Sequence, residues 1–213
     1  MFQQTINQRI FQVIQQLSDF SEIKNSFYMA GGTALALQLG HRKSDDVDLF
    51  STKKFDERII ANIIQNIGGE ITSTATQTIH AKLHSVKVFF IYFPYKMIEP
   101  LNEKLSVGKI KLASVSDIAC MKIMAISQRA EKKDFFDLYE ILKTNSPKEL
   151  KIFLLKKFGE NKINCYHILR SIFYFDDVEE TVEPISLNKT KWSVVRKFLA
   201  KNEKIWVKEM LNC

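Results

Sequence analysis

Residues 29–51 read Met-Ala-Gly-Gly-Thr-Ala-Leu-Ala-Leu-Gln-Leu-Gly-His-Arg-Lys-Ser-Asp-Asp-Val-Asp-Leu-Phe-Ser, and this stretch decides the fold. A glycine pair, Gly31 and Gly32, follows a short apolar run and precedes a string of helix formers that ends at Gly40. This order is typical of a strand, a tight turn and a helix, because glycine tolerates the backbone conformations of tight turns. We expect Thr33 to cap the helix and Gly40 to end it in the left-handed conformation. The free N–H groups at the start of such a helix favour a bound phosphate.

Two aspartates follow this helix on either side of a single valine. Asp46 and Asp48 precede the apolar pair Leu49 and Phe50, as in a strand that enters a core. Because side chains alternate along a strand, the two carboxylates lie on one face. Hard carboxylate oxygens suit Mg²⁺ or Mn²⁺, and Mg²⁺ commonly bridges protein carboxylates to substrate phosphates. We therefore expect Asp46 and Asp48 to hold a metal ion.

Each of these motifs also has a purely structural explanation. Gly-Gly-Thr turns occur in many folds, and Arg42 with Ser44 could steady Asp46 as readily as they could touch a phosphate tail. The order of the motifs is more specific than any one of them. A strand, Gly-Gly, a helix, Arg-x-Ser-x-Asp-x-Asp and an apolar strand resemble the start of the DNA polymerase β-like nucleotidyltransferase superfamily. The particular form resembles the AbiEii/AbiGii toxin family within it.

This resemblance implies an α+β fold, with a nucleotidyltransferase-like mixed β-sheet flanked by helices and followed by a C-terminal helical region. It implies a metal-dependent enzyme that transfers a nucleotide from an NTP to an acceptor, with tRNA or another RNA among the expected acceptors. Family members act as toxins of abortive-infection and toxin–antitoxin systems, so a cognate antitoxin is an expected partner. Two other classes stay open: a catalytically degenerate nucleotide-binding module, and an interaction protein that acts by binding.

A second block of charged residues follows in the C-terminal half. A largely apolar helix is predicted to begin at Ser114, and it carries Lys122 in its middle. A lysine in a buried helix is costly unless its ammonium group meets an anion or reaches water. A solvated ion-pair cluster would have the same composition. The pattern also resembles the second conserved block of the AbiEii-type family, in the form Lys122-x-x-Ala125-x-x-x-Arg129 and then Lys133-Asp134-x-x-Asp137-Leu138-Tyr139.

The resemblance implies which residues form the site. The implied catalytic residues are Asp46, Asp48, Lys122 and Asp137, of which Asp46 and Asp48 bind the metal. The implied nucleotide-binding residues are Gly31, Gly32, Thr33, Arg42, Ser44, Arg129, Lys133 and Asp134. The strand predicted at 83–93 contains no Asp or Glu, although members of the superfamily usually place a third metal carboxylate on such a strand. Either Asp137 takes its place, as a ligand or a general base, or the metal is bound more weakly.

The composition narrows the class of protein. Of the 213 residues 46% are apolar, which argues against disorder, and no apolar run approaches the roughly 20 residues of a membrane span. The chain starts without a signal-like segment, so we expect a cytoplasmic protein without a membrane partner. Cys120, Cys165 and Cys213 are scattered, which favours neither a disulfide framework nor a zinc site. The net charge of +7 would suit nucleic acid, nucleotide phosphates or an acidic antitoxin.

The periodicity predicts the remaining elements and two domains. Helices are expected at 2–17, 56–67, 114–129, 163–175 and 192–211 and from Ser146 onward, and strands at 70–79, 83–93 and 107–112. His80 and His84 are expected to lie in a hairpin connection, as bystanders rather than metal ligands. Residues 1–105 are expected to form the nucleotidyltransferase-like α/β domain, and residues 106–213 a mainly helical domain that completes the active site.

Overall fold

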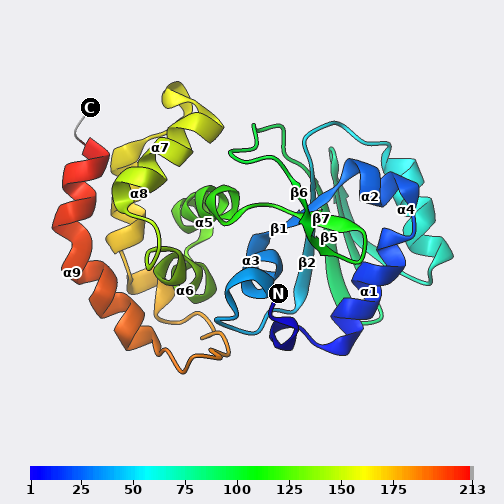
Figure 1. Ribbon diagram of the computed structural model, residues 1–213, viewed down its shortest axis with the longest axis horizontal. Helices are drawn as coiled ribbons and strands as arrows, with labels where there is room; N and C mark the ends of the chain where they lie inside the picture. The colour runs from blue at the N-terminus through cyan, green and yellow to red at the C-terminus, as the bar shows by residue number, and fades with distance from the viewer. Residues whose placement is uncertain (212–213) are drawn as a thin grey trace.

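The computed structural model describes residues 1–211, except for the side chains of residues 102 and 103. It confirms the predicted α+β class, with one mixed β-sheet between layers of helices (Figure 1). The strands are β1 Tyr28–Ala30, β2 Asp46–Ser51, β3 Glu70–Ala75, β4 Thr78–Leu83, β5 Val86–Tyr92, β6 Asn102–Val107 and β7 Ile110–Leu112. The helices are α1 Gln8–Ser18, α2 Ser21–Ser26, α3 Gly31–Leu39, α4 Glu57–Asn66, α5 Val115–Arg129, α6 Lys132–Ile141, α7 Pro147–Phe158, α8 Cys165–Phe173 and α9 Trp192–Leu211, with 3₁₀ turns at Gln3–Thr5, Glu160–Lys162 and Asp176–Val178.

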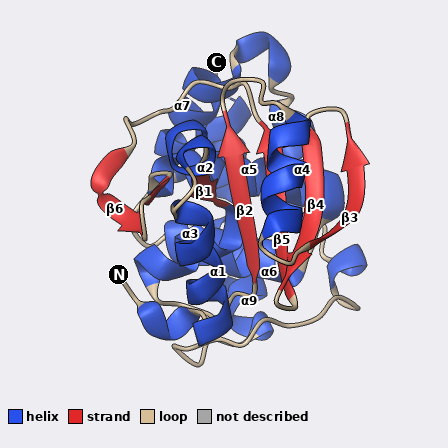
Figure 2. Cartoon of the chain, turned by 90° about the vertical axis from the view of Figure 1, so that its right-hand side faces the viewer, coloured by secondary structure: helices blue, strands red, loops and turns tan. Residues whose placement is uncertain are grey.

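Strand β2 lies at the centre of the sheet, whose order is β3-β4-β5-β2-β1-β7-β6 (Figure 2). It runs parallel to β5 and antiparallel to β1. The register sets Lys87 beside Asp46 and Phe89 beside Asp48, and Ala30 lies beside Asp48 on the other side. The residues that alternate with the two aspartates are fully buried in the core. As predicted, the two carboxylates share one face of the central strand.

The helices form layers on both faces of the sheet (Figure 1). Helices α1, α2 and α4 cover one face, α3 and α5 cover the other, and α6 to α9 pack beyond α5. The outer helices are joined to the core by large side chains. On α9, Trp192, Leu199 and Trp206 are buried at helical spacing. Burial of such side chains stabilises the fold by roughly 1.5–3 kcal/mol each, which holds α9 against the rest of the helical layer.

Helix α3 begins at Gly31, directly after β1. Gly31 has a φ of +69°, a conformation that glycine adopts without strain. The predicted Thr33 cap is wrong: Ala30 occupies the N-cap position in an extended conformation, and Thr33 lies within the first turn. Its hydroxyl donates to the carbonyl of Asp46 instead of to its own helix. Gly40 ends the helix with φ 72° and ψ 14°, which confirms the predicted left-handed terminus.

A buried ion pair joins the end of the sheet to the helical layers. Lys157 Nζ on α7 lies 2.6 Å from Asp117 Oδ1 on α5, and both side chains are fully buried. The same ammonium group donates to the carbonyl of Lys96, and Asp117 accepts from the backbone N–H of Ile98. The segment that follows β5 is therefore held against α5 and α7, as is Phe93, whose ring lies 5.6 Å from Lys157 Nζ.

Several predicted elements require correction. The predicted helix at 2–17 is divided, because the Asn7 side chain caps α1 by accepting from the backbone N–H of Ile10. The predicted connection at His80 is strand β4, and the turn lies at His84 and Ser85, both with positive φ. His80 packs its ring against Phe89 across the strands, 4.8 Å between ring centres. Strand β6, which pairs with β7, was not predicted.

Three further expectations concern the domain division, membrane-spanning segments and the cysteines. The predicted domain division between residues 105 and 106 falls within β6 and stays a prediction. In the described range 1–211, no helix is both long enough and apolar enough to cross a lipid bilayer. Cys120 is buried and, like Cys165, carries a free thiol, whereas Cys213 lies outside the described residues.

Candidate active site

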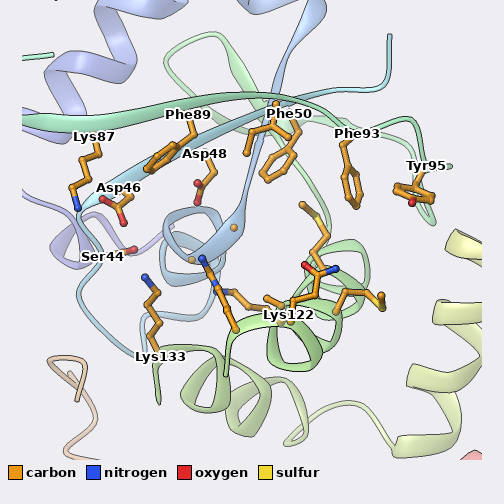
Figure 3. Close-up of a pocket in the computed structure, with 18 of the residues that line it drawn as sticks. Ser44, Asp46, Asp48, Phe50, Lys87, Phe89, Phe93, Tyr95, Lys122 and Lys133 are labelled. Carbon is orange, nitrogen blue, oxygen red and sulfur yellow. The ribbon is translucent and has the colours of Figure 1, made fainter. Parts of the chain in front are cut away.

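A cavity of about 530 Å³ lies between the sheet and helices α5, α6 and α7 (Figure 3). Its two ends differ in character. Ser44, Asp46 and Lys133 lie at one end, and Phe93 and Tyr95 lie at the other. The cavity thus runs from a charged end to an aromatic end.

Two carboxylates from β2 face the charged end. Within residues 1–211, neither Asp46 nor Asp48 has a hydrogen-bond or ion-pair partner for its side chain. The pKa of Asp48 is raised to about 6, chiefly by burial; Lys122 lowers it and Asp46 raises it by smaller amounts. Burial also raises the pKa of Asp46, with a second contribution from Asp45. Two adjacent, partly buried carboxylates without a partner are an arrangement that a bound cation would stabilise.

The glycine pair allows the carboxylate and a guanidinium group to approach the turn closely. A Cβ atom at residue 31 would overlap the carboxylate of Asp48, and one at residue 32 would overlap the guanidinium group of Arg42. Both glycines line the cavity. Their small size therefore serves the packing of Asp48 and Arg42 as well as access for a ligand.

Thr33 and Ser44 connect the helix to the start of β2. The Thr33 hydroxyl is hydrogen-bonded to Ser44 Oγ at 2.9 Å and to the carbonyl of Asp46. Ser44 lines the cavity, whereas Thr33 is buried behind it. Thr33 thus positions the strand that carries the carboxylates, and the predicted direct contact with a nucleotide is not supported by its place.

Four of the cations predicted from the sequence line the cavity: Arg42, Lys122, Arg129 and Lys133. Figure 3 shows Lys122 and Lys133 across the cavity from Asp46 and Asp48. Lys122 is only 4% exposed, and its Nζ atom lies 2.7 Å from Asp134 Oδ1 and 2.6 Å from Asp137 Oδ2. Burial alone would lower the pKa of Lys122, but Asp137 and Asp134 raise it above its usual value. The ammonium group therefore stays charged beside the cavity.

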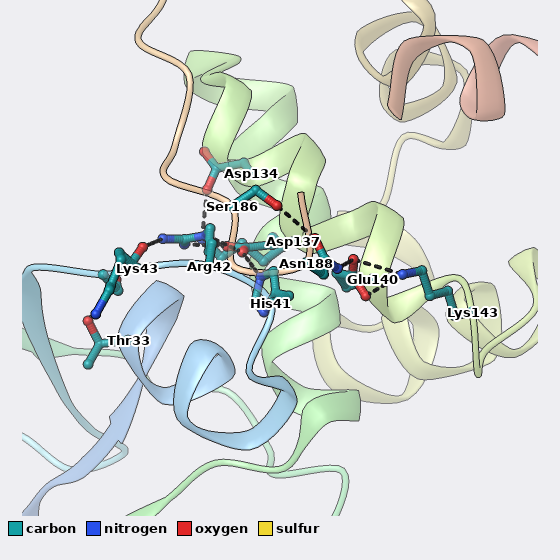
Figure 4. Close-up of polar contacts among 12 residues, drawn as sticks. Thr33, His41, Arg42, Lys43, Asp134, Asp137, Glu140, Lys143, Ser186 and Asn188 are labelled. Atoms are coloured by element: carbon teal, nitrogen blue, oxygen red, sulfur yellow. Dashed lines mark hydrogen bonds and ion pairs between the residues drawn. The ribbon is translucent and has the colours of Figure 1, made fainter. Parts of the chain in front are cut away.

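Asp137 is the centre of this cation arrangement (Figure 4). Arg42 donates to both of its oxygens, from Nε at 2.7 Å and from Nη2 at 2.8 Å, and His41 Nε2 lies 2.7 Å from Oδ1. With Lys122 on Oδ2, each carboxylate oxygen has two cationic or ring-nitrogen partners. Burial would raise the pKa of Asp137, but Arg42 and Lys122 hold it well below its usual value.

The predicted role of Asp137 as a third metal ligand or a general base is therefore not supported. Its side chain is fully buried, does not line the cavity and has no free oxygen. Asp134 is also fully buried and binds Lys122 and Arg129 instead of facing the cavity. On β5, the positions beside Asp46 and Asp48 belong to Lys87 and Phe89, so no third carboxylate stands there.

The structure brings most of the predicted site residues together. Those that line the cavity are Gly31, Gly32, Arg42, Ser44, Asp46, Asp48, Lys122, Arg129 and Lys133, and those that lie behind its wall are Thr33, Asp134 and Asp137. The sequence did not reveal Lys87 and Phe89, because only the β2–β5 register places them there. The available signal was that Lys87 and Phe89 lie two residues apart on a predicted strand, which places both side chains on the same face.

The aromatic end was also not predicted. Tyr95 lies 4.7 Å from the rings of both Phe93 and Phe158, measured between ring centres, and Lys162 lies over the Tyr95 ring at 5.6 Å. Phe158 comes from α7, far along the chain from the others. A flat ring system could stack among these side chains, since aromatic faces attract one another in offset or edge arrangements.

The donor set fits a divalent cation that keeps several of its waters. Asp46 and Asp48 supply hard oxygen ligands from one strand face, and both lack partners among the described side chains. No group of three His, Cys, Asp or Glu side chains that could hold a metal occurs among the described residues. Substrate phosphates and water would have to complete the coordination.

Comparison with known proteins places the chain in one family. The sequence model of the family described as "Nucleotidyl transferase AbiEii toxin, Type IV TA system" matches residues 15–210. The uncharacterized protein aq_aa25 of Aquifex aeolicus (strain VF5) is 36% identical over 188 residues, which cover 85% of this chain and 88% of that protein.

Solved structures share the fold at low sequence identity. MenT4, the nucleotidyltransferase toxin Rv2826c from Mycobacterium tuberculosis H37Rv, has a TM-score of 0.55 at 16% identity, over 92% of this chain and 84% of that chain. JHP933 from Helicobacter pylori has a TM-score of 0.54 at 15% identity, over 94% and 90% of the two chains. The architecture is thus common to chains whose sequences differ at most positions.

Proposed function

Since the chain belongs to the nucleotidyl transferase AbiEii toxin family, we propose that it transfers a nucleotide from an NTP to a hydroxyl group of an RNA, with tRNA as the first candidate. The proposed reaction depends on Mg²⁺ or Mn²⁺ held by Asp46 and Asp48. In the proposed biological role the protein is the toxin of an abortive-infection or toxin–antitoxin system, with a cognate antitoxin.

One observation carries the proposal: a single cavity joins partner-free carboxylates, buried cations and an aromatic end. An NTP has the same sequence of chemical groups, with phosphates that bind metal and cations at one end and a flat base at the other. Lys122 and Arg129 supply positive charge for the phosphates, and Arg guanidinium groups suit phosphate oxygens in particular. Phe93, Tyr95 and Phe158 supply ring faces and edges for the base.

Each group of site residues then has its own role in the proposed reaction. Asp46 and Asp48 would hold the metal, which when bound would draw the acceptor oxygen and the α-phosphate together and offset their charge. The N-terminal turn of α3, with its two glycines, faces the cavity and offers backbone N–H groups to the phosphate tail. Lys122 stays fixed between two aspartates, so that its charge needs no rearrangement when the substrate binds.

The bond changes balance without a further reactant. The acceptor oxygen forms a bond to the α-phosphorus, and the bond from that phosphorus to the oxygen bridging to the β-phosphate breaks. Pyrophosphate leaves with the electron pair, and the hydroxyl proton passes to water at the mouth of the cavity. The product is an RNA extended or capped by one nucleotide.

The test is incorporation of label into RNA. Purified protein is incubated with each of four NTPs labelled at the α-phosphate, total tRNA and Mg²⁺. We expect labelled RNA with the wild type, and none with Asp48→Asn. Asp177→Asn, which changes an exposed carboxylate outside the cavity, is the matched control and should keep full activity.

Other outcomes identify the alternatives. NTP binding without incorporation into RNA or protein would identify a degenerate nucleotide-binding module. Toxicity in cells that persists in Asp46→Ala would identify a protein that acts by binding alone. Label found only on the protein would move the acceptor from RNA to a protein hydroxyl.

A further inference from the structure

A second hollow, of about 720 Å³, lies between α2, α4, the start of β1 and β7, the end of β2 and the segment that follows β5. Among the described residues, none lines both this hollow and the active-site cavity. Strand β2 reaches both spaces, since Asp46 at its start lines the cavity and Ser51 at its end lines the hollow. The hollow is therefore a separate space, and the proposed nucleotide transfer makes no use of it.

Lysines dominate the charge of this hollow. Among the described residues, the cations that line it are Lys24, Lys53, Lys54, Lys109 and Lys111. Lys109 is paired with Asp19 at 3.1 Å. The ammonium groups of Lys24, Lys53 and Lys54 have no hydrogen-bond or ion-pair partner within residues 1–211. Several like charges that converge on one hollow attract an anion.

The two carboxylates that line the described part of the hollow are engaged at the starts of their own helices. Asp56 accepts from the backbone N–H of Arg58 at 2.9 Å and so caps α4. Glu22, in the first turn of α2, accepts from Ser21 Oγ at 2.8 Å. The described lysines therefore outnumber the carboxylates, and the charge of the hollow favours an anionic ligand.

Apolar side chains form another part of the wall. The rings of Phe27 and Phe55 lie 5.0 Å apart, and Ile59 on α4 lines the hollow with 43% of its surface exposed. The backbone of Phe55 is fixed, because its N–H and carbonyl both bond to the side-chain amide of Gln77, at 2.9 and 3.0 Å. A molecule with an anionic end and a flat, apolar end would meet the lysines and cover Phe55 and Ile59.

The wall also holds a buried hydroxyl without a partner. Tyr28 lines the hollow and is only 2% exposed, and its hydroxyl has no hydrogen-bond partner among the described residues. Buried polar side-chain atoms nearly always have a partner in native proteins. The Tyr28 hydroxyl thus marks a position that an oxygen atom of a ligand could fill, independently of the lysines.

We propose that this space, the lysine hollow, binds a small phosphorylated molecule with a ring-shaped body, such as a nucleotide. Its phosphates meet Lys24, Lys53 and Lys54, and its ring covers Phe55 and Ile59. Ammonium groups bind phosphate oxygens through charge-assisted hydrogen bonds, and flat rings pack on aromatic side chains. The inference does not depend on the proposed function, since a protein without transferase activity could carry the same site.

The rate at which each lysine is acetylated, read by mass spectrometry, tests whether the hollow is occupied. The protein is treated with N-hydroxysuccinimidyl acetate in excess EDTA, with increasing ADP, pyrophosphate or adenosine. We expect saturating ADP to slow the acetylation of Lys24, Lys53 and Lys54 by about tenfold or more. Pyrophosphate should do so only at higher concentration, and adenosine should have no effect. Lys197, which is exposed on α9, should react at an unchanged rate.

A double variant, Lys53→Gln with Lys54→Gln, removes two of the proposed contacts. The ADP concentration that half-protects Lys24 should rise by about tenfold or more, because each charge-assisted bond contributes to the affinity. Lys201→Gln with Lys204→Gln, which changes two exposed lysines of α9, is the matched control and should leave this concentration unchanged. Thermal melting should show that both proteins fold.

Several results would overturn the proposal. One is that neither ADP nor pyrophosphate slows acetylation of the three lysines. Another is protection by a 5′-phosphorylated single-stranded RNA but not by ADP, which would assign the phosphate to a nucleic-acid end. Equal potency of pyrophosphate and ADP would refute the contact with Phe55 and Ile59. Arg129→Gln changes only the active-site cavity, so loss of protection in that variant would place the ADP there instead of in the lysine hollow.

Discussion

At the scale of single residues, Asp137 shows how one carboxylate arranges cations from distant parts of the chain. It binds Arg42 from the segment after α3 and Lys122 from α5, and it is fully buried itself. A side chain with both oxygens occupied cannot take part in proton or metal chemistry directly. We therefore expect Asp137 to act as a positioning residue, which fixes the cations that line the cavity.

The first prediction concerns Asp137→Asn. The change removes the charge but keeps the shape, so Arg42 and Lys122 become buried cations with less compensation. Loss of one partner of a buried ion pair destabilises a protein by about 3–5 kcal/mol. We expect the free energy of unfolding, measured in urea, to fall by this amount. Asp19→Asn, which breaks an exposed pair with Lys109, should change stability by less than about 1 kcal/mol.

The pH dependence of this difference follows from the lowered pKa of Asp137. The stabilisation is present above the unfolded-state pKa of roughly 4 and is lost as the pH falls through the folded-state value below it. The free energies of unfolding of the wild type and of Asp137→Asn should therefore differ by a constant amount above about pH 5 and converge in strong acid. A difference that grows on acidification would contradict the ion-pair explanation.

The second prediction has the opposite sign and concerns Asp48→Asn. Burial raises the pKa of Asp48 to about 6, so its ionised form destabilises the metal-free protein near neutral pH. One pKa unit corresponds to about 1.4 kcal/mol, and we expect the variant to be more stable by about 1–3 kcal/mol at pH 7.5 in excess EDTA. The difference should vanish below about pH 3, where Asp48 is protonated in both the folded and the unfolded state. A lower melting temperature for the variant at pH 7.5 would mark Asp48 as a structural residue.

At the scale of elements, the turn between β1 and α3 and the strand β2 form one packed unit. The turn is close enough to β2 that a side chain at residue 31 would overlap Asp48. Thr33 bonds the first turn of α3 to the start of the same strand. The position of the carboxylates therefore depends on the small size of residues in a neighbouring element.

The third prediction tests this packing with Gly31→Ala. Both the positive φ and the overlap with Asp48 oppose the methyl group, so we expect lost stability and lost nucleotide transfer. Gly68→Ala is the matched control, because Gly68 has a φ of +75° and no neighbour within 4 Å of its Cβ position. The control should lose about 1 kcal/mol from backbone strain alone and keep its activity. Equal losses in the two variants would argue against the overlap.

Sequence patterns predicted the elements whose signals are local. The glycine pair, the left-handed Gly40 and the alternation around Asp46 and Asp48 all act within a few residues, and α3 and β2 form as predicted. Thr33 was misplaced because a hydroxyl near a helix start can bond to another element as well as to its own helix. Strand β6 lacks a local signal of comparable strength, and its pairing with β7 defines it.

At the scale of the whole molecule, the cavity depends on contacts between the sheet and the helical layers. The carboxylates stand on the sheet, and three of the cations, Lys122, Arg129 and Lys133, come from α5 and α6. The aromatic end needs Phe158 of α7 beside Tyr95, which follows β5. The buried pair of Lys157 and Asp117 holds these layers together at that end.

The fourth prediction concerns Lys157→Met. The change leaves Asp117 as a buried charge without its cation, and we expect a loss of about 3–5 kcal/mol in urea unfolding. Replacing Asp117 by leucine in the same chain should recover part of the loss, because the uncompensated charge is then gone. Lys197→Met on the exposed side of α9 should have little effect. A Lys157→Met protein as stable as the wild type would refute the proposed link.

Long-range features could not be read from local patterns. Lys87 reaches Asp46 only through the β2–β5 register, and Phe158 reaches Tyr95 only through the packing of α7. The resemblance brought Asp137 into the site, but which of its neighbours occupy its oxygens depends on the folded arrangement. The sequence thus predicted most residues of the site. It did not predict which of them line the cavity and which lie buried behind its wall.

The distribution of the cavity wall along the chain has a consequence during protein synthesis. The ribosome releases Asp46 and Asp48 well before Lys122, Arg129 and Lys133, and Phe158 and Lys162 emerge later still. A nascent or prematurely terminated polypeptide would therefore carry the two carboxylates with Arg42 and Lys87, but without the cations of α5 and α6. The complete cavity wall can therefore assemble only when translation of the chain is close to its end.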